Sequence, residues 1–242
     1  MEHPILFITV ILEQLGWISH SMDGIGKAAL LRLSQPHITY AWFVMAFLIF
    51  IPKLTMGKNI EMIPGKGQNF WEVLIGGMES FMAETMGKEG AKMMFPMLAT
   101  FGLFIIVSNL VGLMPLFMSP TSNLNVTLGC TIIVVTTTHI LGVKFHGVGY
   151  IKHFCGPIPW LIPLMLPIEI ISHGARLLSL SLRLFGNIMA KEVLLGILFL
   201  LAGAFFAPLP ILCLGILVSV VQALVFVLLS MLYFAGAMEH AH

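Results

Sequence analysis

Charged residues are scarce in this sequence. Only 10% of its 242 residues are Asp, Glu, Lys or Arg, and the formal net charge is +1, whereas a soluble domain is typically about 25% charged. So few charges cannot cover the surface of a water-soluble globule, and so small a net charge cannot hold nucleic acid by its phosphates. The composition therefore predicts an integral membrane protein with membrane lipid around it and no nucleic-acid partner.

Cysteine is also scarce, and no cofactor motif is present. The sequence has three cysteines, which are Cys130, Cys155 and Cys213. They have no CxxC spacing, which argues against a disulfide framework or a thiolate metal site. No Gly-rich nucleotide-binding loop occurs, which argues against a nucleotide site on this chain. His139, His146 and His153 lie seven residues apart, but glycines and a lysine break that region into a loop. We therefore expect no cofactor and no metal.

Long uncharged stretches indicate where the chain crosses the bilayer. No charge occurs in the 51 residues between Lys92 and Lys144, or in the 46 residues between Glu192 and Glu239. A spanning helix needs about 20 apolar residues, so each stretch holds two passes. A polar turn divides the first stretch and a pair of prolines divides the second. We predict about five spanning helices, near 36–54, 93–117, 125–143, 160–200 and 210–237.

Residues 60–90 have a different character. Apolar side chains recur there at helical spacing, with acidic side chains off that stripe, which is typical of an amphipathic helix in the membrane interface. The chain is thus predicted to be all-α and to form one membrane domain over residues 1–242. Its expected parts are an external N-terminal segment (1–35), a first span (36–54), an interfacial helix (60–90), a helical hairpin (93–143) and a long tilted C-terminal helical hairpin (160–237).

The distribution of Lys and Arg predicts the orientation. Alternate assignment of the connections gives one side only Lys27 and Arg32, whereas the other side receives seven basic residues. These seven are Lys53, Lys58, Lys66, Lys88, Lys92, Lys144 and Lys152. Because cytoplasmic loops are enriched in Lys and Arg, we expect the N-terminus outside and the C-terminus in the cytoplasm. The expected location is a bacterial inner membrane.

A charged stripe runs along the helix predicted at 160–200. Glu169, Arg176 and Arg183 are spaced by sevens, which keeps them on one face of a helix, and Ser172 and Asn187 widen that polar face. Ionisable side chains inside a membrane are costly and by default mark a pathway for ions or substrate. The alternative is a buried ion-pair network that only holds helices together.

Arg183 has no acidic residue three or four positions away. The nearest acid is Glu192, nine residues later, which on a regular helix is about 13.5 Å along the axis and half a turn around it. We therefore expect Arg183 to find its partner on another helix or another chain. Gln222 and Asn109, lone amides in other predicted spans, are by themselves more typical of helix–helix hydrogen bonds than of a site.

The run Ser179-Leu-Ser-Leu-Arg183-Leu-Phe-Gly-Asn187-Ile-Met-Ala-Lys-Glu192 closely resembles the signature of subunit a of F-type ATP synthases. Asn109-Leu-Val-Gly-Leu-Met-Pro, Asn123-Leu-Asn-Val-Thr-Leu and Gln222-Ala support the resemblance, which covers roughly residues 90–240. It implies a non-catalytic, ion-translocating stator subunit of a rotary ATP synthase. The implied partners are a carboxylate-bearing ring of c subunits, the peripheral-stalk subunit b and the rest of the complex.

The same resemblance implies roles for individual residues. Arg183 matches the family's essential arginine, which attracts each ring carboxylate and prevents ions from crossing directly between two offset half-channels. Asn187, Glu192 and Gln222 match positions of the outer half-channel, and Glu169 and Ser172 match positions of the inner one. Arg176 lies between these sets on the charged stripe.

Two other functional classes compete with this interpretation. An independent secondary transporter with an ionisable site at the midplane is the main alternative, but such proteins often contain internal repeats, and no matching halves are evident. A membrane redox subunit needs pairs of histidines on spanning helices to hold haem, and only His139 is well placed within a predicted span.

Overall fold

The structure, a computed structural model, describes residues 36–56, 65–114, 117–147, 162–202 and 208–238. Predictions for residues 1–35 and for the remaining connections lie outside the described residues. The helices are α3 (Pro36–Met56), α4 (Lys66–Val111), the short 3-10 helix η1 (Pro120–Ser122), α5 (Leu124–His146), α7 (Ile162–Ala202) and α8 (Pro208–Met238). No strand occurs in these ranges.

The predicted class, an all-α integral membrane protein, is confirmed. Four described helices, α3, α4, α5 and α8, are long and apolar enough to cross a membrane. Helix α7 is not among these four. It has 41 residues, which rise about 60 Å against a hydrocarbon core of about 30 Å, and it carries the charged stripe.

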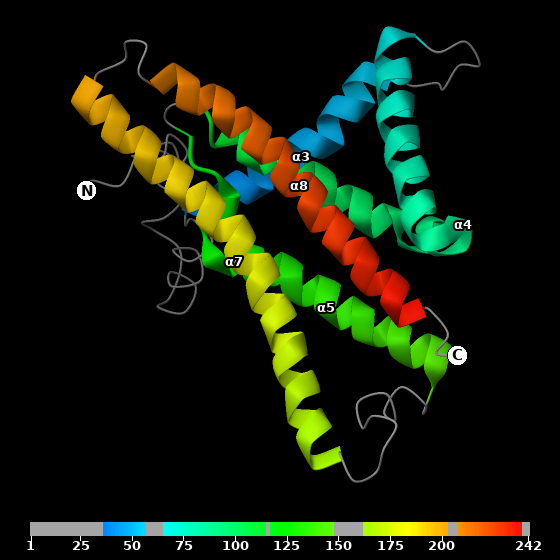
Figure 1. Cartoon of the computed structure of the whole chain (residues 1–242). Helices are drawn as coiled ribbons and strands as arrows, with labels where there is room; N and C mark the ends of the chain where they lie inside the picture. Colours follow the sequence, from blue (N-terminus) through cyan, green and yellow to red (C-terminus); the bar gives the residue numbers. More distant parts are fainter. Residues whose placement is uncertain (1–35, 57–64, 115–116, 148–161, 203–207, 239–242) are drawn as a thin grey trace, which may run out of the picture.

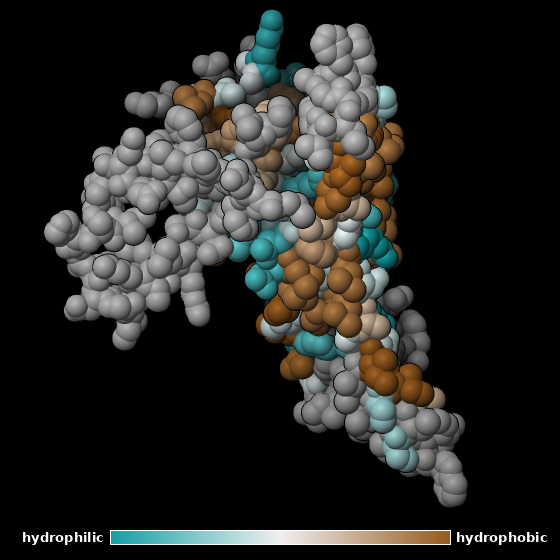
Figure 2. All heavy atoms as spheres, turned by 90° about the vertical axis from the view of Figure 1, so that its left-hand side faces the viewer, coloured by the Kyte–Doolittle hydropathy of each residue, from teal (hydrophilic) through white to brown (hydrophobic). Residues whose placement is uncertain are grey.

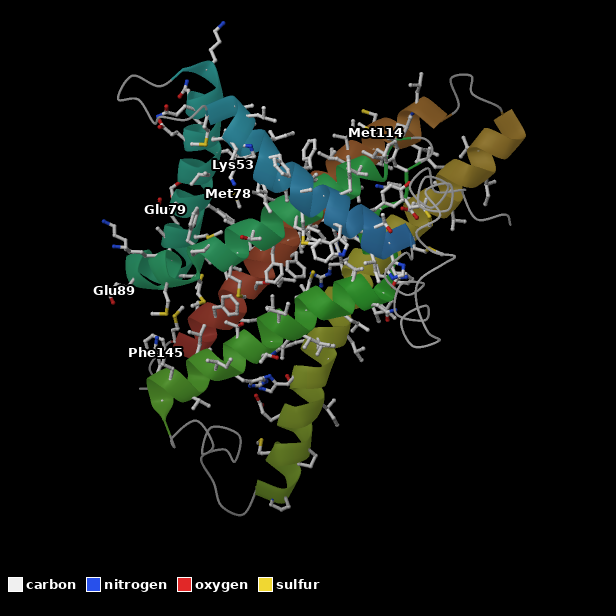
Figure 3. All side chains as sticks on the ribbon, turned by 180° about the vertical axis from the view of Figure 1, so that it is seen from behind. Lys53, Met78, Glu79, Glu89, Met114 and Phe145 are labelled. Atoms are coloured by element: carbon white, nitrogen blue, oxygen red, sulfur yellow. The ribbon has the colours of Figure 1, made fainter. Side chains whose placement is uncertain are left out.

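Helix α4 contains both the predicted interfacial helix and the second predicted span. It is interrupted at Gly87, where φ is 76° and ψ is 161°. A glycine adopts positive φ readily because it lacks a Cβ, so the chain can turn sharply there. Figure 1 shows the first part of α4 meeting the second part at this bend, with the start of the first part reaching the end of α3. Glu79, before the bend, and Glu89, after it, point outward (Figure 3).

The second part of α4 ends at Val111, earlier than the predicted end at residue 117. Gly112 caps the helix by donating its backbone N–H to the carbonyl oxygens of Ser108 and Leu110. Pro115 follows shortly, and a proline restricts the residue before it and cannot continue the hydrogen-bond ladder. The chain then returns through η1, so that polar backbone groups lie beside the end of α4.

The core lies where α8 packs along the second part of α4 and crosses α5 and α7 (Figure 1). Its fully buried side chains include Leu98, Ile105, Phe226, Met231 and Phe234. The predicted apolar stripe of the interfacial segment is only partly in contact with this core. Met78, Phe81, Met82 and Met86 pack there, whereas Phe70 and Val73 are exposed.

Helices α7 and α8 form the predicted long hairpin, and one of its faces is uncovered. On α7 the buried positions include Leu180, Leu184, Ile188 and Leu195, which recur at helical spacing and face α5 and α8. The exposed apolar side chains of the hairpin include Leu178, Leu182, Val193, Leu217 and Val221. Figure 2 shows that hydrophobic side chains cover much of the visible face of the molecule, interrupted by hydrophilic patches.

The contact between the end of α3 and the start of α4 depends on Gly67. A Cβ at this position meets the backbone carbonyl of Thr55, and the indole N–H of Trp71 donates to Thr55 Oγ1 at 2.8 Å. We expect Gly67→Ala to lower the free energy of unfolding by about 1–3 kcal/mol, since a backbone atom cannot move aside cheaply. Thermal unfolding in detergent measures this. Gly76→Ala is the matched control, because a Cβ there meets nothing within 4 Å; an equal loss in both variants contradicts the packing argument.

Candidate functional site

Arg183 lies on the uncovered face of α7. Its side chain is exposed, and its guanidinium donates to Ser179 Oγ at 3.5 Å, one turn earlier on the same helix. Among the described residues no carboxylate lies within ion-pairing distance of Arg183. The guanidinium is thus a fixed positive charge, because it stays protonated at any working pH.

Asn187, one turn after Arg183, connects α7 to α8. Its amide Nδ2 donates to Oε1 of the buried Gln222 at 2.8 Å. The helix–helix hydrogen bond expected for Gln222 is therefore present. Beside this bond a groove of about 410 Å³ runs between the two helices, and its lining includes Asn187, Lys191, Leu214, Gly215 and Gln222. The groove places two amides and an amine along an otherwise apolar surface.

Glu192 lies on the opposite side of α7 from Arg183, as the half-turn offset predicts. Its Oε1 accepts the backbone N–H of Ser119 at 3.0 Å, at the start of η1. Ser119 is fully buried and continues the polar chain, because its hydroxyl donates to the Ser108 carbonyl at 3.0 Å and lies 2.6 Å from Thr121 Oγ1. Thr121 in turn donates to Asn109 Oδ1 at 2.6 Å. A carboxylate, two hydroxyls and an amide thus form one connected network.

Lys191 is buried next to this network. Its side chain is 8% exposed, and Nζ lies 3.4 Å from the Asn109 carbonyl oxygen. Gly215 on α8 leaves room for the stem, since a Cβ there lies 3.1 Å from Lys191 Cδ and 2.5 Å from Leu113 Cδ2. A buried ammonium is costly unless polar groups surround it. Lys191 therefore places a basic amine, held by the Asn109 carbonyl, close to Glu192.

A second polar cluster lies near the other end of α7. Glu169 Oε1 is 3.3 Å from Nε2 of His173, one turn later. The His173 ring lies against His139 of α5, with ring centroids 4.8 Å apart. Arg176 covers the Tyr233 ring of α8 at 5.5 Å. This cluster therefore joins three helices.

The two clusters lie on opposite sides of Arg183 along the helix axis. Glu169 precedes Arg183 by about 21 Å and Glu192 follows it by about 13.5 Å, from the rise of an α-helix. The arrangement is therefore two polar clusters along α7 with a fixed cation between them.

Comparison with known proteins identifies the family of this chain. Residues 38–235 match the family described as ATP synthase A chain. The chain belongs to this family. The protein named ATP synthase subunit a from Desulfotalea psychrophila is 63% identical, and those from Desulfosudis oleivorans and Syntrophobacter fumaroxidans are 53% and 52% identical. Each match covers 100% of both chains. The resemblance seen in the sequence is confirmed.

In this member of the ATP synthase A chain family, the sequence-predicted site residues fall into separate groups. Asn187 and Gln222 are bonded to each other, Glu192 joins the η1 network, and Glu169 belongs to the distant cluster. Ser172 is half-buried on α7 and makes no hydrogen bond to these groups among the described residues. Arg176 contacts Tyr233 rather than a carboxylate.

Several polar contacts of this family member were not anticipated. No functional role was predicted from the sequence for Ser119, Thr121, Lys191, His139 and His173. A signal existed for Ser119 and Thr121, because the polar run 118–123 is unusual between two apolar stretches. For the two histidines no local pattern predicts the contact, since they lie on different helices. Among the described residues no group of three His, Cys, Asp or Glu side chains is placed to hold a metal.

Proposed function

We propose that this chain is the ion-translocating stator subunit of a rotary F-type ATP synthase, and that Arg183 couples proton flow to rotation of a ring of c subunits. The observation that carries the proposal is the position of Arg183 on a broad, uncovered, apolar face, where it has no carboxylate partner among the residues that the structure describes. Such a charge is costly in a bilayer. A mid-membrane carboxylate on a neighbouring chain is the partner that offsets this cost.

The uncovered face of α7 and α8 suits a moving partner. Leu178 and Leu182 are 54% and 50% exposed, and Leu217 and Val221 on α8 are 60% and 48% exposed. This surface is smooth and apolar apart from the arginine and the groove amides, so a ring can slide over it without breaking many hydrogen bonds. We assign it to the c ring, and we expect the peripheral-stalk subunit b and the rest of the complex elsewhere.

The outer access path passes through the Glu192 network in this proposal. Glu192 accepts the backbone N–H of Ser119, and the side chains of Ser119, Thr121 and Asn109 continue the hydrogen-bonded network. Glu192 is the member that can take up and release a proton. Ser108 Oγ is buried without a hydrogen-bond partner among the described residues, and such a group is typically satisfied by water. Asn187 and Gln222 then line the step from this network to the ring-facing groove.

The inner access path uses Glu169 and Ser172. Both are half-buried near the start of α7. In Figure 1 that end of the helix lies on the same lower side of the molecule as the end of α5, where Lys144 is exposed, and the end of α8, although it is separated from both. Because lysines favour the cytoplasmic side, we assign this end to the cytoplasm, with the C-terminus inside and the N-terminus outside. The two paths meet only through the ring, with Arg183 between them.

The energy scale is consistent with this role. One charge crossing 100 mV releases about 2.3 kcal/mol, and an arginine at the centre of a membrane helix costs about 2.5–3.5 kcal/mol on insertion scales. The interaction of a fixed arginine with a carboxylate is therefore comparable in energy to the membrane potential that drives one ion across the bilayer.

An independent secondary transporter remains the alternative function. Family membership and the uncovered face favour the stator, because a transporter encloses its substrate site between its own repeats. Purification separates the two functions. We expect the chain to purify with a ring of small proteolipids, and vesicles holding the complex to acidify on addition of ATP. Purification of the chain alone, together with substrate uptake that needs no other subunit, contradicts the proposal.

A further inference from the structure

His139 and His173 form a contact that the proposed paths leave unused. The two rings come from different helices, α5 and α7, and their centroids are 4.8 Å apart with planes at 49°. The half-buried pair lies within a membrane-spanning region, and His173 is 17% exposed. Imidazoles are an unusual filling for such an interface, where apolar side chains or neutral amides normally pack.

The surroundings of the two rings are polar on three helices. Glu169 on α7 lies 3.3 Å from His173 Nε2 and is the more exposed partner, at 30%. Arg176, also on α7, is near enough to both histidines to act on them electrostatically, and it stacks on Tyr233 of α8. The carboxylate favours a positively charged imidazole, whereas the arginine disfavours one. Two imidazolium ions in contact also repel each other, so the pair holds at most one extra proton.

We propose that His139, His173 and Glu169 form a proton relay in the cytoplasm-side path, resting on the function proposed above. A neutral imidazole has one nitrogen that accepts a proton and one that donates, so it can take up a proton on one side and release it on the other. The proton on Glu169 Oε1 moves to His173 Nε2, and the carboxylic acid becomes a carboxylate. The imidazolium then releases the proton on its other nitrogen, Nδ1, toward the c ring, and Glu169 takes up a new proton from the cytoplasmic side. Rotation of the imidazole returns His173 to its starting tautomer, so that each cycle carries one proton.

The position of the cluster fits this role. Glu169, which is more exposed than His173, lies in the third turn of α7, and His173 follows one turn further into the helix. Arg183 lies ten residues beyond His173, or about 15 Å along the axis. The relay therefore begins at the membrane surface and continues toward the arginine. His139 extends it to α5 and shares the single proton with His173.

The test measures ATP hydrolysis by the whole complex in detergent, where no gradient builds up and small bases can be added freely. We expect His173→Ala to slow coupled hydrolysis about tenfold, equivalent to about 1.4 kcal/mol on the barrier. Imidazole added to the buffer should restore most of the rate. Pyrazole, which has the same ring size but is hardly basic, should restore none. If His173 had only a structural role, imidazole and pyrazole would restore the rate equally. Equal rescue by the two compounds therefore overturns the proposal.

Matched variants keep the test decisive. His146→Ala removes a histidine in the last turn of α5, seven residues beyond His139, and we expect its rate to be unchanged. If His173→Ala does not assemble, His173→Gln keeps most of the volume and hydrogen bonding but not the basicity, and should be equally slow. Arg183→Ala shows whether hydrolysis is coupled. If Arg183→Ala slows hydrolysis whereas His173→Gln does not, only the relay is wrong. If Arg183→Ala has no effect on hydrolysis, the proposed function itself is wrong.

Discussion

Arg183→Ala is expected to abolish ATP-driven proton pumping while passive proton leak through the membrane sector persists or increases. We expect pumping to fall by at least about 100-fold, which corresponds to about 2.7 kcal/mol. The guanidinium has no carboxylate partner among the described residues, so the substitution does not leave an acid of this chain buried and unpaired. Assembly should therefore survive, and the loss should appear in coupling rather than in stability.

The two parts of this result have separate physical causes. Without the cation, a deprotonated ring carboxylate has no attractive partner on the uncovered face, and its movement through the interface becomes costly. Without the same cation, nothing repels a proton or hydronium ion that passes directly from one access path to the other. The measurements are acidification of vesicles by ATP and, in a separate assay, the decay of an imposed pH difference.

Arg176→Ala is the matched comparison for Arg183→Ala. It removes the same charge from the same helix, seven residues earlier, where the guanidinium stacks on Tyr233. We expect a smaller loss of pumping and no added leak, because Arg176 lies at the side of one path rather than between the two. Normal pumping by a fully assembled Arg183→Ala complex contradicts the stator mechanism and leaves Arg183 with a structural role only.

Glu192→Gln is expected to reduce pumping and passive proton conductance together, by about tenfold or about 1.4 kcal/mol. The amide oxygen can still accept the Ser119 backbone N–H that Glu192 Oε1 now accepts at 3.0 Å, so the contact between α7 and η1 should persist. What the amide cannot do is take up and release a proton at physiological pH. The variant therefore separates the protonatable function of this side chain from its structural one.

Two comparisons sharpen the Glu192 experiment. Glu79→Gln makes the same chemical change on the outward-facing part of α4 (Figure 3), and it should leave pumping unchanged. Glu192→Leu also removes the acceptor of the Ser119 N–H, so it should add a loss of complex stability of about 1–3 kcal/mol. If Glu192→Gln pumps normally while Glu192→Leu fails to assemble, the carboxylate serves only as a hydrogen-bond acceptor.

The local sequence was sufficient to predict the helices and the direction in which their side chains point. Uncharged stretches longer than a bilayer requires gave α3, α5 and α8 within a few residues of their observed ends, because membrane insertion depends on local hydropathy and helix length. The periodicity of the α-helix also placed Arg183 and Glu192 on opposite faces before any packing was known. The roles of these side chains stay predictions, which the experiments above test.

The tertiary structure decided which polar groups meet. Glu192 bonds to Ser119, 73 residues away, and Lys191 lies beside Asn109, 82 residues away; His139 and His173 meet across two helices. Each contact depends on where α4 ends, how η1 returns and how α8 crosses its neighbours, and none of these is set by the residues nearby in sequence. Burial and helix periodicity are local properties that a sequence carries by itself. Which polar groups pair inside a membrane is decided by packing between helices, because each buried polar group needs a partner that only the assembled bundle provides.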